Sequence, residues 1–310
     1  MTWDNWNLRM NPSASSGQHR AKSRCFAVPI LKEPRRLVSG SLIYLILSFS
    51  FCYAFSQTPQ PTTTTTIKAI PEQVISTSAT NESFSFIVFG DNRDGDKTFK
   101  DLVERVRAEA GVDFIVNTGD FVSNGEKKQY NNYLGMVSKL KPKLYHVPGN
   151  HDLVKGGDKY FKKYFGPLYY SFDYKNSHFI VLNNAFKGYF DAQQFQWLKK
   201  DLAKTGKDHI FVFMHRPVFD PSEIYKNYVM SGREVTKQLM ALFEKYQVDY
   251  VIAGHIHGYA RAERRGIVYV VSGGAGAPLY LPADFGGFYH YVRIDVNGEM
   301  ITDRTVKIYD

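Results

Sequence analysis

Seven short apolar runs, each of a length typical of one buried β-strand, recur in this chain from residue 84 onward. The runs are residues 84–89, 114–116, 144–147, 179–182, 210–214, 250–253 and 267–271. Between them, apolar residues recur at helical spacing around Leu102, Leu198 and Leu242. This alternation of strands and helices predicts an α/β domain, and 44% apolar residues suffice for its core.

Side chains of the types that bind metal ions follow five of these runs, at the point where each strand is expected to end. They are Asp91, Asp120, Asn150 with His151 and Asp152, His215, and His255 with His257. A glycine before a single Asp or Asn is ordinary turn chemistry, and a single histidine at a strand end is ordinarily structural. The ordered set is different, because the carboxyl ends of strands in an open α/β sheet meet at one edge. We therefore expect these side chains to share one site.

Two literal segments, GNHD at residues 149–152 and GHIH at residues 254–257, carry a family resemblance. In this order with the two aspartates, they resemble the signature of the calcineurin-like metallophosphoesterases, and the resemblance covers residues 83–308. It implies an α/β/β/α sandwich of two mixed β-sheets flanked by helices, with the site on loops at one edge. It also implies a small phosphorylated substrate and two divalent or trivalent transition-metal ions, Mn, Fe or Zn.

The resemblance also assigns metal ligands by position. It makes Asp120 the carboxylate that bridges both ions, gives Asp91 and His257 to the first ion, and gives Asn150, His215 and His255 to the second. The residue types suit this chemistry, because carboxylates bring negative charge and imidazoles bind borderline ions through a neutral nitrogen. Oxygen and nitrogen ligands without sulfur disfavour soft-metal sites.

His151 is the candidate for handling a proton or stabilising the transition state, and Asp152 is expected to fix its tautomer and raise its basicity. The simpler alternative is that His151 is a loop residue held by Asp152. Asn150 lies beside them and would also contact the substrate. The expected reaction is hydrolysis of a phosphate ester, preferably a monoester, by a metal-activated water. The alternatives are a phosphodiesterase or nuclease of the same fold, or a non-catalytic protein that binds an anion.

The first motif departs from the family pattern, which is Asp-x-His, because residue 93 is Arg. A guanidinium stays protonated and does not ligate metals. Arg93 would bind a substrate phosphate, which is the interpretation we favour, or pair with Asp91 or Asp94, or leave the first ion weakly bound or absent. In addition, residue 123 is Ser where the purple acid phosphatase branch of the family requires Tyr, so that branch is not expected.

Four other histidines and two further segments receive structural interpretations. His146, His178, His209 and His290 lie in or beside strand patterns and are expected to be structural. Residues 272–278, rich in glycine, predict a tight loop near the site rather than a phosphate-binding loop, because no clear helix follows. The tyrosine-rich residues 160–174 would either cap a substrate cleft or pack in the core.

Residues 1–56 are interpreted as an N-terminal extension with a signal peptide or membrane anchor. An apolar run that ends at Phe55 follows Arg35 and Arg36. Cleavage after Ser56 predicts an exported protein, periplasmic or extracellular. Without cleavage, residues 37–55 would anchor the domain outside the cytoplasm. Residues 57–82 then form a Thr/Pro-rich linker, and residues 83–310 form the metallophosphoesterase domain.

Both cysteines, Cys25 and Cys52, lie in this extension, so the rest of the chain has no thiol chemistry. The extension also carries seven Lys and Arg against two acidic residues, which leaves 32 basic and 28 acidic residues, or +4, for the remainder. This excess is weak for a polyanion groove, so no nucleic-acid partner is evident and a membrane is expected only through the N-terminal segment. The oligomeric state is not indicated by the sequence.

Overall fold

The structure is a computed structural model that describes residues 82–309. The expected extension, signal peptide or anchor, and nearly all of the linker lie outside the described residues. Within residues 82–309, no helix has the length and apolar character needed to span a bilayer.

The first of two sheets has the strand order β11-β10-β1-β2-β3. Its strands are β1 (Phe84–Phe89), β2 (Phe114–Asn117), β3 (Lys143–His146), β10 (His290–Asn297) and β11 (Met300–Lys307). Strands β1, β2 and β3 are parallel, whereas β10 pairs antiparallel with both β1 and β11. The sheet is therefore mixed, with its parallel strands on one side.

The second sheet has the strand order β4-β5-β6-β7-β9-β8. Its strands are β4 (Tyr170–Tyr174), β5 (Ser177–Val181), β6 (His209–Met214), β7 (Tyr250–Ala253), β8 (Tyr259–Arg264) and β9 (Ile267–Ser272). The four central strands are parallel, and the two edge strands, β4 and β8, pair antiparallel with their neighbours. This sheet is also mixed.

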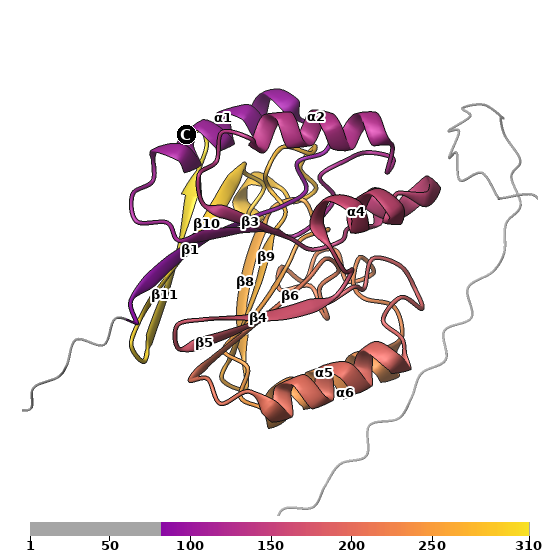
Figure 1. Ribbon diagram of the computed structural model, residues 1–310, viewed down its shortest axis with the longest axis vertical. Coiled ribbons are helices and arrows are strands. Elements are labelled where there is room, and N and C mark those ends of the chain that lie inside the picture. Colours follow the sequence, from indigo (N-terminus) through magenta and orange to yellow (C-terminus); the bar gives the residue numbers. More distant parts are fainter. Residues whose placement is uncertain (1–81, 310) are drawn as a thin grey trace, which may run out of the picture. The chain divides into compact units, whose positions relative to one another are not determined.

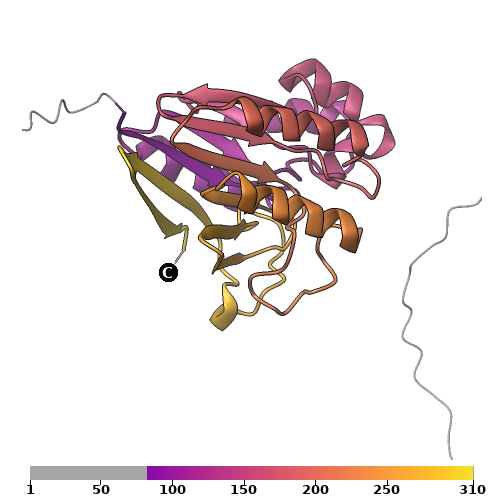
Figure 2. The same cartoon turned by 90° about the horizontal axis from the view of Figure 1, so that it is seen from below.

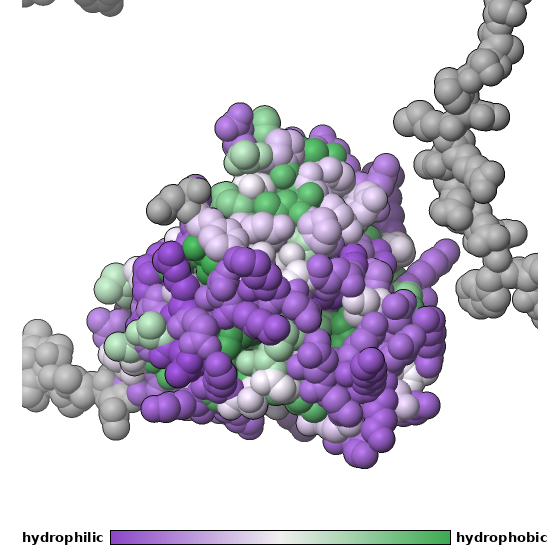
Figure 3. Space-filling model, turned by 90° about the horizontal axis from the view of Figure 1, so that it is seen from above, coloured by the Kyte–Doolittle hydropathy of each residue, from purple (hydrophilic) through white to green (hydrophobic). Residues whose placement is uncertain are grey.

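Helices cover the outer faces of both sheets. The helices of the described chain are α1 (Asp96–Ala108), α2 (Lys127–Val137), α3 (Asn150–Leu153), α4 (Asp158–Phe165), α5 (Ala192–Lys204) and α6 (Arg233–Lys245), with short 3-10 turns at Val154–Gly156 and Ala283–Phe285; α3 is a single turn that carries part of the GNHD segment. Helices α1 and α2 lie over the first sheet, and α5 and α6 lie side by side over the second (Figures 1 and 2). The outer surface over α1 and α2 is largely hydrophilic (Figure 3), as expected for helices with only one buried face.

Alternation along β1 shows how one strand serves two cores. Ile87 and Phe89 pack beneath α1 and α2, whereas Phe86 and Val88 pack between the two sheets. Successive side chains of a strand point to opposite faces, so a strand buried on both sides is apolar throughout. A third core lies between the second sheet and helices α5 and α6. The predicted α/β/β/α sandwich of two mixed sheets is confirmed.

All seven predicted strands are present, with ends shifted by at most two residues. The tyrosine-rich residues 160–174 include most of α4 and all of β4. Their aromatic rings pack against the two cores that border the first sheet, except that of Tyr169, which lies against Trp197. These residues therefore pack in the sandwich, which is the second of the two alternatives that the sequence left open.

Candidate metal centre

The site residues lie in loops, or in the short helix α3, that follow strands of both sheets, and hydrogen bonds join the two sets. The His215 ring, after β6, donates through Nδ1 to the Thr118 carbonyl oxygen, after β2, at 2.9 Å. The backbone N–H of His255, after β7, donates to Asp91 Oδ2, after β1, at 2.9 Å. The strand ends converge as predicted, and the place where they meet lies between the two sheets.

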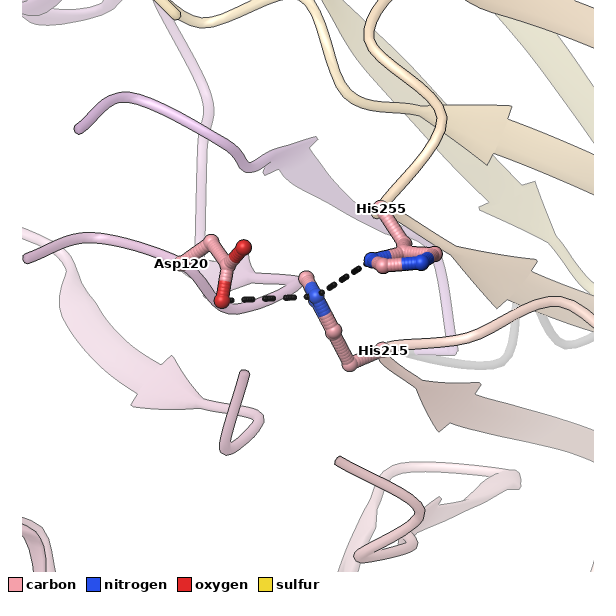
Figure 4. Close-up of side chains that lie close together, drawn as sticks. All are labelled: Asp120, His215 and His255. Carbon is pink, nitrogen blue, oxygen red and sulfur yellow. Dashed lines mark hydrogen bonds and ion pairs between the residues drawn. The ribbon is translucent and has the colours of Figure 1, made fainter. Parts of the chain in front are cut away.

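Asp120, His215 and His255 form a group whose ligand-type atoms all lie within 4.8 Å of one another (Figure 4). Asp120 Oδ1 is 3.4 Å from His215 Nε2, and His215 Nε2 is 3.2 Å from His255 Nδ1. One carboxylate oxygen and two imidazole nitrogens on a common centre are a normal set for a first-row transition metal or zinc.

The tautomer of His215 is fixed by its hydrogen bond to Thr118. A carbonyl oxygen only accepts, so Nδ1 carries a hydrogen, and Nε2 is the ring nitrogen that faces Asp120 and His255. His257 is fixed in the same way, because its Nδ1 donates to the Pro278 carbonyl oxygen at 2.6 Å. A backbone acceptor on the far ring nitrogen is the usual support of a metal-binding histidine.

Asp91 and His257 form a second pair beside this group, with 3.5 Å between Asp91 Oδ1 and His257 Nε2. Asp91 Oδ1 is buried and has no hydrogen-bond partner in the described part of the chain. Leaving a buried carboxylate oxygen without a partner is costly, and a bound cation removes that cost. The donor atoms present therefore fit a metal ion on this side as well.

The electrostatics of the group reflect crowded carboxylates. Burial raises the pKa of Asp91 to about 7, with His215 opposing and Asp120 adding to the shift. Burial acts to lower the pKa of His215, but Asp120 outweighs it and raises the value to about 9. At pH 7 a proton on His215 therefore lies among side-chain atoms that would otherwise bind a cation. Burial lowers the pKa of His257 to about 4, so this ring is neutral at pH 7, which is the form that binds metals.

Three of the predicted ligand residues have a left-handed backbone. The φ angles are 58° at Asp91, 54° at Asp120 and 68° at His255. Such angles cost on the order of 1 kcal/mol for a residue with a Cβ and persist only where the surroundings impose them. Strain at three clustered positions is typical of a functional site.

Two glycines of the literal motifs are required for close approach. A Cβ on Gly149, whose φ is an ordinary −90°, would overlap the backbone nitrogen and Oδ1 of Asp120. A Cβ on Gly254 would overlap Asp91 Oδ2. These glycines therefore let the loops pass against the carboxylates.

The predicted role of Asp152 in fixing the His151 tautomer is wrong. Both carboxylate oxygens of Asp152 are buried and accept from backbone nitrogens, those of Gly149, Asp120, Phe121 and Val122, at 2.8–3.1 Å. The His151 ring instead has Nδ1 2.8 Å from the Ser123 carbonyl oxygen. That carbonyl, not a carboxylate, fixes the tautomer and leaves Nε2 free. Asp152 is a structural tie between two site loops.

His151 itself faces the site. Its Nε2 lies 4.0 Å from Asp120 Oδ2, and its side chain is 34% exposed, so it can meet a molecule that enters from solvent. Its backbone N–H donates to Asp120 Oδ1 at 2.9 Å.

Arg93 pairs with Asp94, which is one of the alternatives that the sequence left open. Its Nη1 pairs with Asp94 Oδ2 at 2.6 Å, while Nε lies 3.6 Å from Asp120 Oδ2 and has no hydrogen-bond partner in residues 82–309. Asp94 also accepts from the Ser123 hydroxyl. The guanidinium is thus braced on its outer side and directed at the site on its inner side.

Sequence reasoning missed Arg216, which directly follows His215. Its Nη2 donates to Asn150 Oδ1 at 3.3 Å, and its Nε donates to the Ala185 carbonyl oxygen at 2.9 Å. Within the described residues, no carboxylate forms an ion pair with it, so a half-buried positive charge stands beside the site. The only available signal was an arginine next to a predicted ligand.

The loop after β9 braces the first motif, as predicted for residues 272–278. Ala275 donates to the Gly90 carbonyl oxygen at 3.0 Å, and Ala277 donates to that of Asp91 at 2.8 Å. The other four histidines lie in the packing of the sandwich. For example, His146 Nε2 meets the Tyr133 hydroxyl at 2.9 Å, and His178 lies between Asp173 and Asp201.

A two-sheet sandwich with a carboxylate and histidine group on its strand ends defines a metal-binding α/β protein of the phosphoesterase class. The family model of the calcineurin-like phosphoesterases matches residues 84–259, and the chain belongs to this family. The family acts on phosphoric ester bonds, and the relatives named below are phosphatases or phosphodiesterases.

Two curated relatives illustrate the range of activities named for proteins that are similar to this chain. The chain is 28% identical over 175 residues to a 3′,5′-cyclic-nucleotide phosphodiesterase of Nostoc sp., covering 55% of this chain and 64% of the relative. It is 33% identical over 119 residues to a purple acid phosphatase of Glycine max, covering 36% of this chain and 25% of the relative. The match thus spans less than two thirds of each relative's own length.

Two solved structures show the same fold. A purple acid phosphatase from yellow lupin (Lupinus luteus) seeds superposes with a TM-score of 0.63 at 16% identity, covering 74% of this chain and 52% of that one. A dimetal phosphatase from Danio rerio superposes with a TM-score of 0.57 at 16% identity, covering 73% of this chain and 97% of that one.

Proposed function

We propose that this protein hydrolyses a small phosphate ester, preferably a monoester, at a site that holds two metal ions. The observation that carries the proposal is the group of Asp120, His215 and His255, whose ligand-type atoms all lie within 4.8 Å of one another. The unpartnered Oδ1 of Asp91 beside His257 supports a second ion next to the first.

The residues that would hold the ions follow the predicted assignment. Asp120 would contact both ions, Asp91 and His257 the first, and Asn150, His215 and His255 the second. Mn, Fe and Zn suit these donors. When bound, such a pair supplies positive charge over the phosphate oxygens and a water of lowered pKa as nucleophile.

The chain's own residues would bind the phosphate and move a proton. Arg93 and Arg216 each direct a guanidinium at the site, so they would donate to phosphate oxygens that the metals leave free. His151, with Nδ1–H held by Ser123, presents Nε2 and would protonate the departing oxygen from its imidazolium form.

A diesterase is the second candidate, because one relative is named as a cyclic-nucleotide phosphodiesterase. Both reactions use the same metals and the same in-line attack, so substrate preference decides between them. Four chromogenic measurements on the purified full chain separate the candidates: p-nitrophenyl phosphate and bis(p-nitrophenyl) phosphate, each after loading with Mn or Zn.

We expect faster turnover of the monoester, and we expect His151→Asn to lose roughly a hundredfold to ten-thousandfold in kcat with its metal content unchanged. Faster turnover of the diester would instead identify a diesterase. Full metal loading without turnover of either ester would identify a protein that only binds anions.

Export is part of the same proposal, with residues 83–310 as the exported domain. N-terminal sequencing of the protein recovered outside the cytoplasm should find Gln57 first if the leader is cleaved. Recovery in the membrane fraction with the leader intact would indicate the anchor, and recovery in the cytosol would refute export.

A further inference from the structure

Two loops border the candidate metal centre and are joined to each other by tyrosines. The first, residues 215–232, follows β6, and the second, residues 273–289, follows β9. The Tyr225 hydroxyl donates to the Tyr280 carbonyl oxygen at 2.8 Å, and the Tyr225 ring packs against a small core that contains Leu281. This tie fixes one loop against the other.

The rings of Tyr280 and Tyr228 lie against histidines of the site. Tyr280 stacks on His257 with 3.8 Å between ring centroids and 15° between planes, and its N–H donates to the His257 carbonyl oxygen at 2.8 Å. Tyr228 packs edge-on against Tyr280, with centroids 5.8 Å apart, and lies 6.0 Å from His255. Two aromatic rings thus line the side of the metal centre.

Tyr228 is 45% exposed although its backbone is held in place. Its N–H donates to the Tyr225 carbonyl oxygen at 2.8 Å, and Met230, two residues on, donates to that of Pro217 at 2.8 Å. The Asp220 carboxylate ties the start of the loop by accepting from Ser222 and Tyr225. The exposed ring is therefore positioned by the loop, and its hydroxyl makes no hydrogen bond with the described residues.

We propose that Tyr228 and Tyr280 form a stacking platform for a planar aromatic group carried by the phosphate ester, such as a nucleobase. This inference rests on the proposed function and names its substrate class. Tyr280 stacks on His257 and Tyr228 lies beside His255, so a ring attached to a phosphate bound at the metals would lie beside these two tyrosines. Stacking on aromatic side chains tolerates different bases, because every base has a π-face.

The platform predicts a preference that depends on the ring alone. Adenosine 5′-monophosphate and ribose 5-phosphate share the phosphate and the sugar, and they differ in the base. Base stacking on aromatic side chains strengthens binding by roughly 5- to 150-fold. We expect the metal-loaded full chain to bind the nucleotide tighter than the sugar phosphate by a factor in this range, measured by titration calorimetry.

Tyr228→Ala should remove most of this factor and leave binding of ribose 5-phosphate unchanged, while Tyr228→Phe should retain it. Tyr309→Ala is the matched control, because Tyr309 is also exposed (41%) but donates to Asp101 on α1. A second comparison, between phenyl phosphate and glycerol phosphate, tests whether an aryl ester rather than a nucleotide supplies the ring.

Equal affinity for nucleotide and sugar phosphate, together with equal affinity for the phenyl and glycerol esters, would overturn the platform. So would a Tyr228→Ala variant that weakens all four ligands alike. Because the readout is binding, the two proposals fail separately: a ring preference that depends on Tyr228 with no hydrolysis of any ester would sustain the platform and refute the proposed reaction.

Discussion

Asp152 shows how a single residue can be identified from sequence and still be given the wrong role. Its place in the GNHD segment marks it as part of the site, but its hydrogen-bond partners include the backbone of residues 120–122 on another loop. No spacing along the chain encodes that contact. The carboxylate holds Asp120 and Gly149 together, so its influence on the reaction is through ligand position.

Asp152→Asn should destabilise the fold and weaken metal binding together. An amide group presents an N–H where backbone donors converge, and an unsatisfied buried polar group costs about 1–3 kcal/mol. Urea unfolding and metal analysis measure both effects. A variant with normal stability and full metal content, but with a changed pH profile of kcat, would favour the tautomer role that the structure contradicts.

Arg93→Ala should raise KM for a phosphate monoester by roughly tenfold or more and leave the metal content unchanged, because hydrogen bonds to charged groups contribute about 1.5–3 kcal/mol. Arg265→Ala, which removes an exposed arginine paired with Glu244, is the control. Loss of one metal equivalent with an unchanged KM would show that Arg93 serves to support Asp120 rather than to bind substrate.

At the scale of elements, strands that form continuous apolar runs in the sequence were predictable and the others were not. The seven predicted strands are continuous apolar runs, whereas β10 alternates between buried and less buried residues and β8 and β11 are largely exposed. These antiparallel strands are partly exposed to solvent, so they carry no continuous apolar run, whereas the parallel edge strand β3 keeps one although it is only partly buried. Helix α2 was missed for a similar reason, since only Tyr130 and Tyr133 are fully buried.

The end of β3 makes the stability of the fold depend on pH. His146 is buried, stacks on Phe165 with 3.7 Å between centroids, and has its pKa lowered by burial from 6.5 to about 3. The unfolded chain therefore binds this proton more readily than the folded chain. Stability from this group is complete above pH 6.5 and declines as the pH falls toward 3.

Between about pH 7.5 and about pH 5, His146 alone should account for a loss of about 2 kcal/mol in the free energy of unfolding. Urea unfolding at both pH values tests this, with His146→Gln as the comparison, because glutamine keeps a polar partner for Tyr133. The variant should lose less stability on acidification than the natural chain. An identical pH dependence would show that folding does not lower the pKa of His146.

At the scale of the whole molecule, the two sheets supply different halves of one centre. Residues after β1, β2 and β3 bring the carboxylates and the GNHD segment, and residues after β6 and β7 bring the histidines. Sequence order revealed this set because each member ends a recognisable strand. The sequence did not reveal Arg216, Tyr228 and Tyr280, because their proposed roles depend on contacts between segments that are distant along the chain.

The bridging position of Asp120 is the point on which both halves depend. Asp120→Asn keeps the size of the side chain and tolerates the left-handed backbone, but it removes the charge that both ions would share. The matched control is Asp208→Asn, which alters an exposed residue that precedes β6, at the end of the strand away from the site.

Metal content of the purified full chain, measured by elemental analysis after loading with Mn or Zn, tests the central claim most directly. The account predicts two equivalents per chain in the natural protein and in Asp208→Asn, and the loss of both in Asp120→Asn. A natural chain that binds no metal, or an Asp120→Asn variant that retains two tightly bound ions, would contradict it.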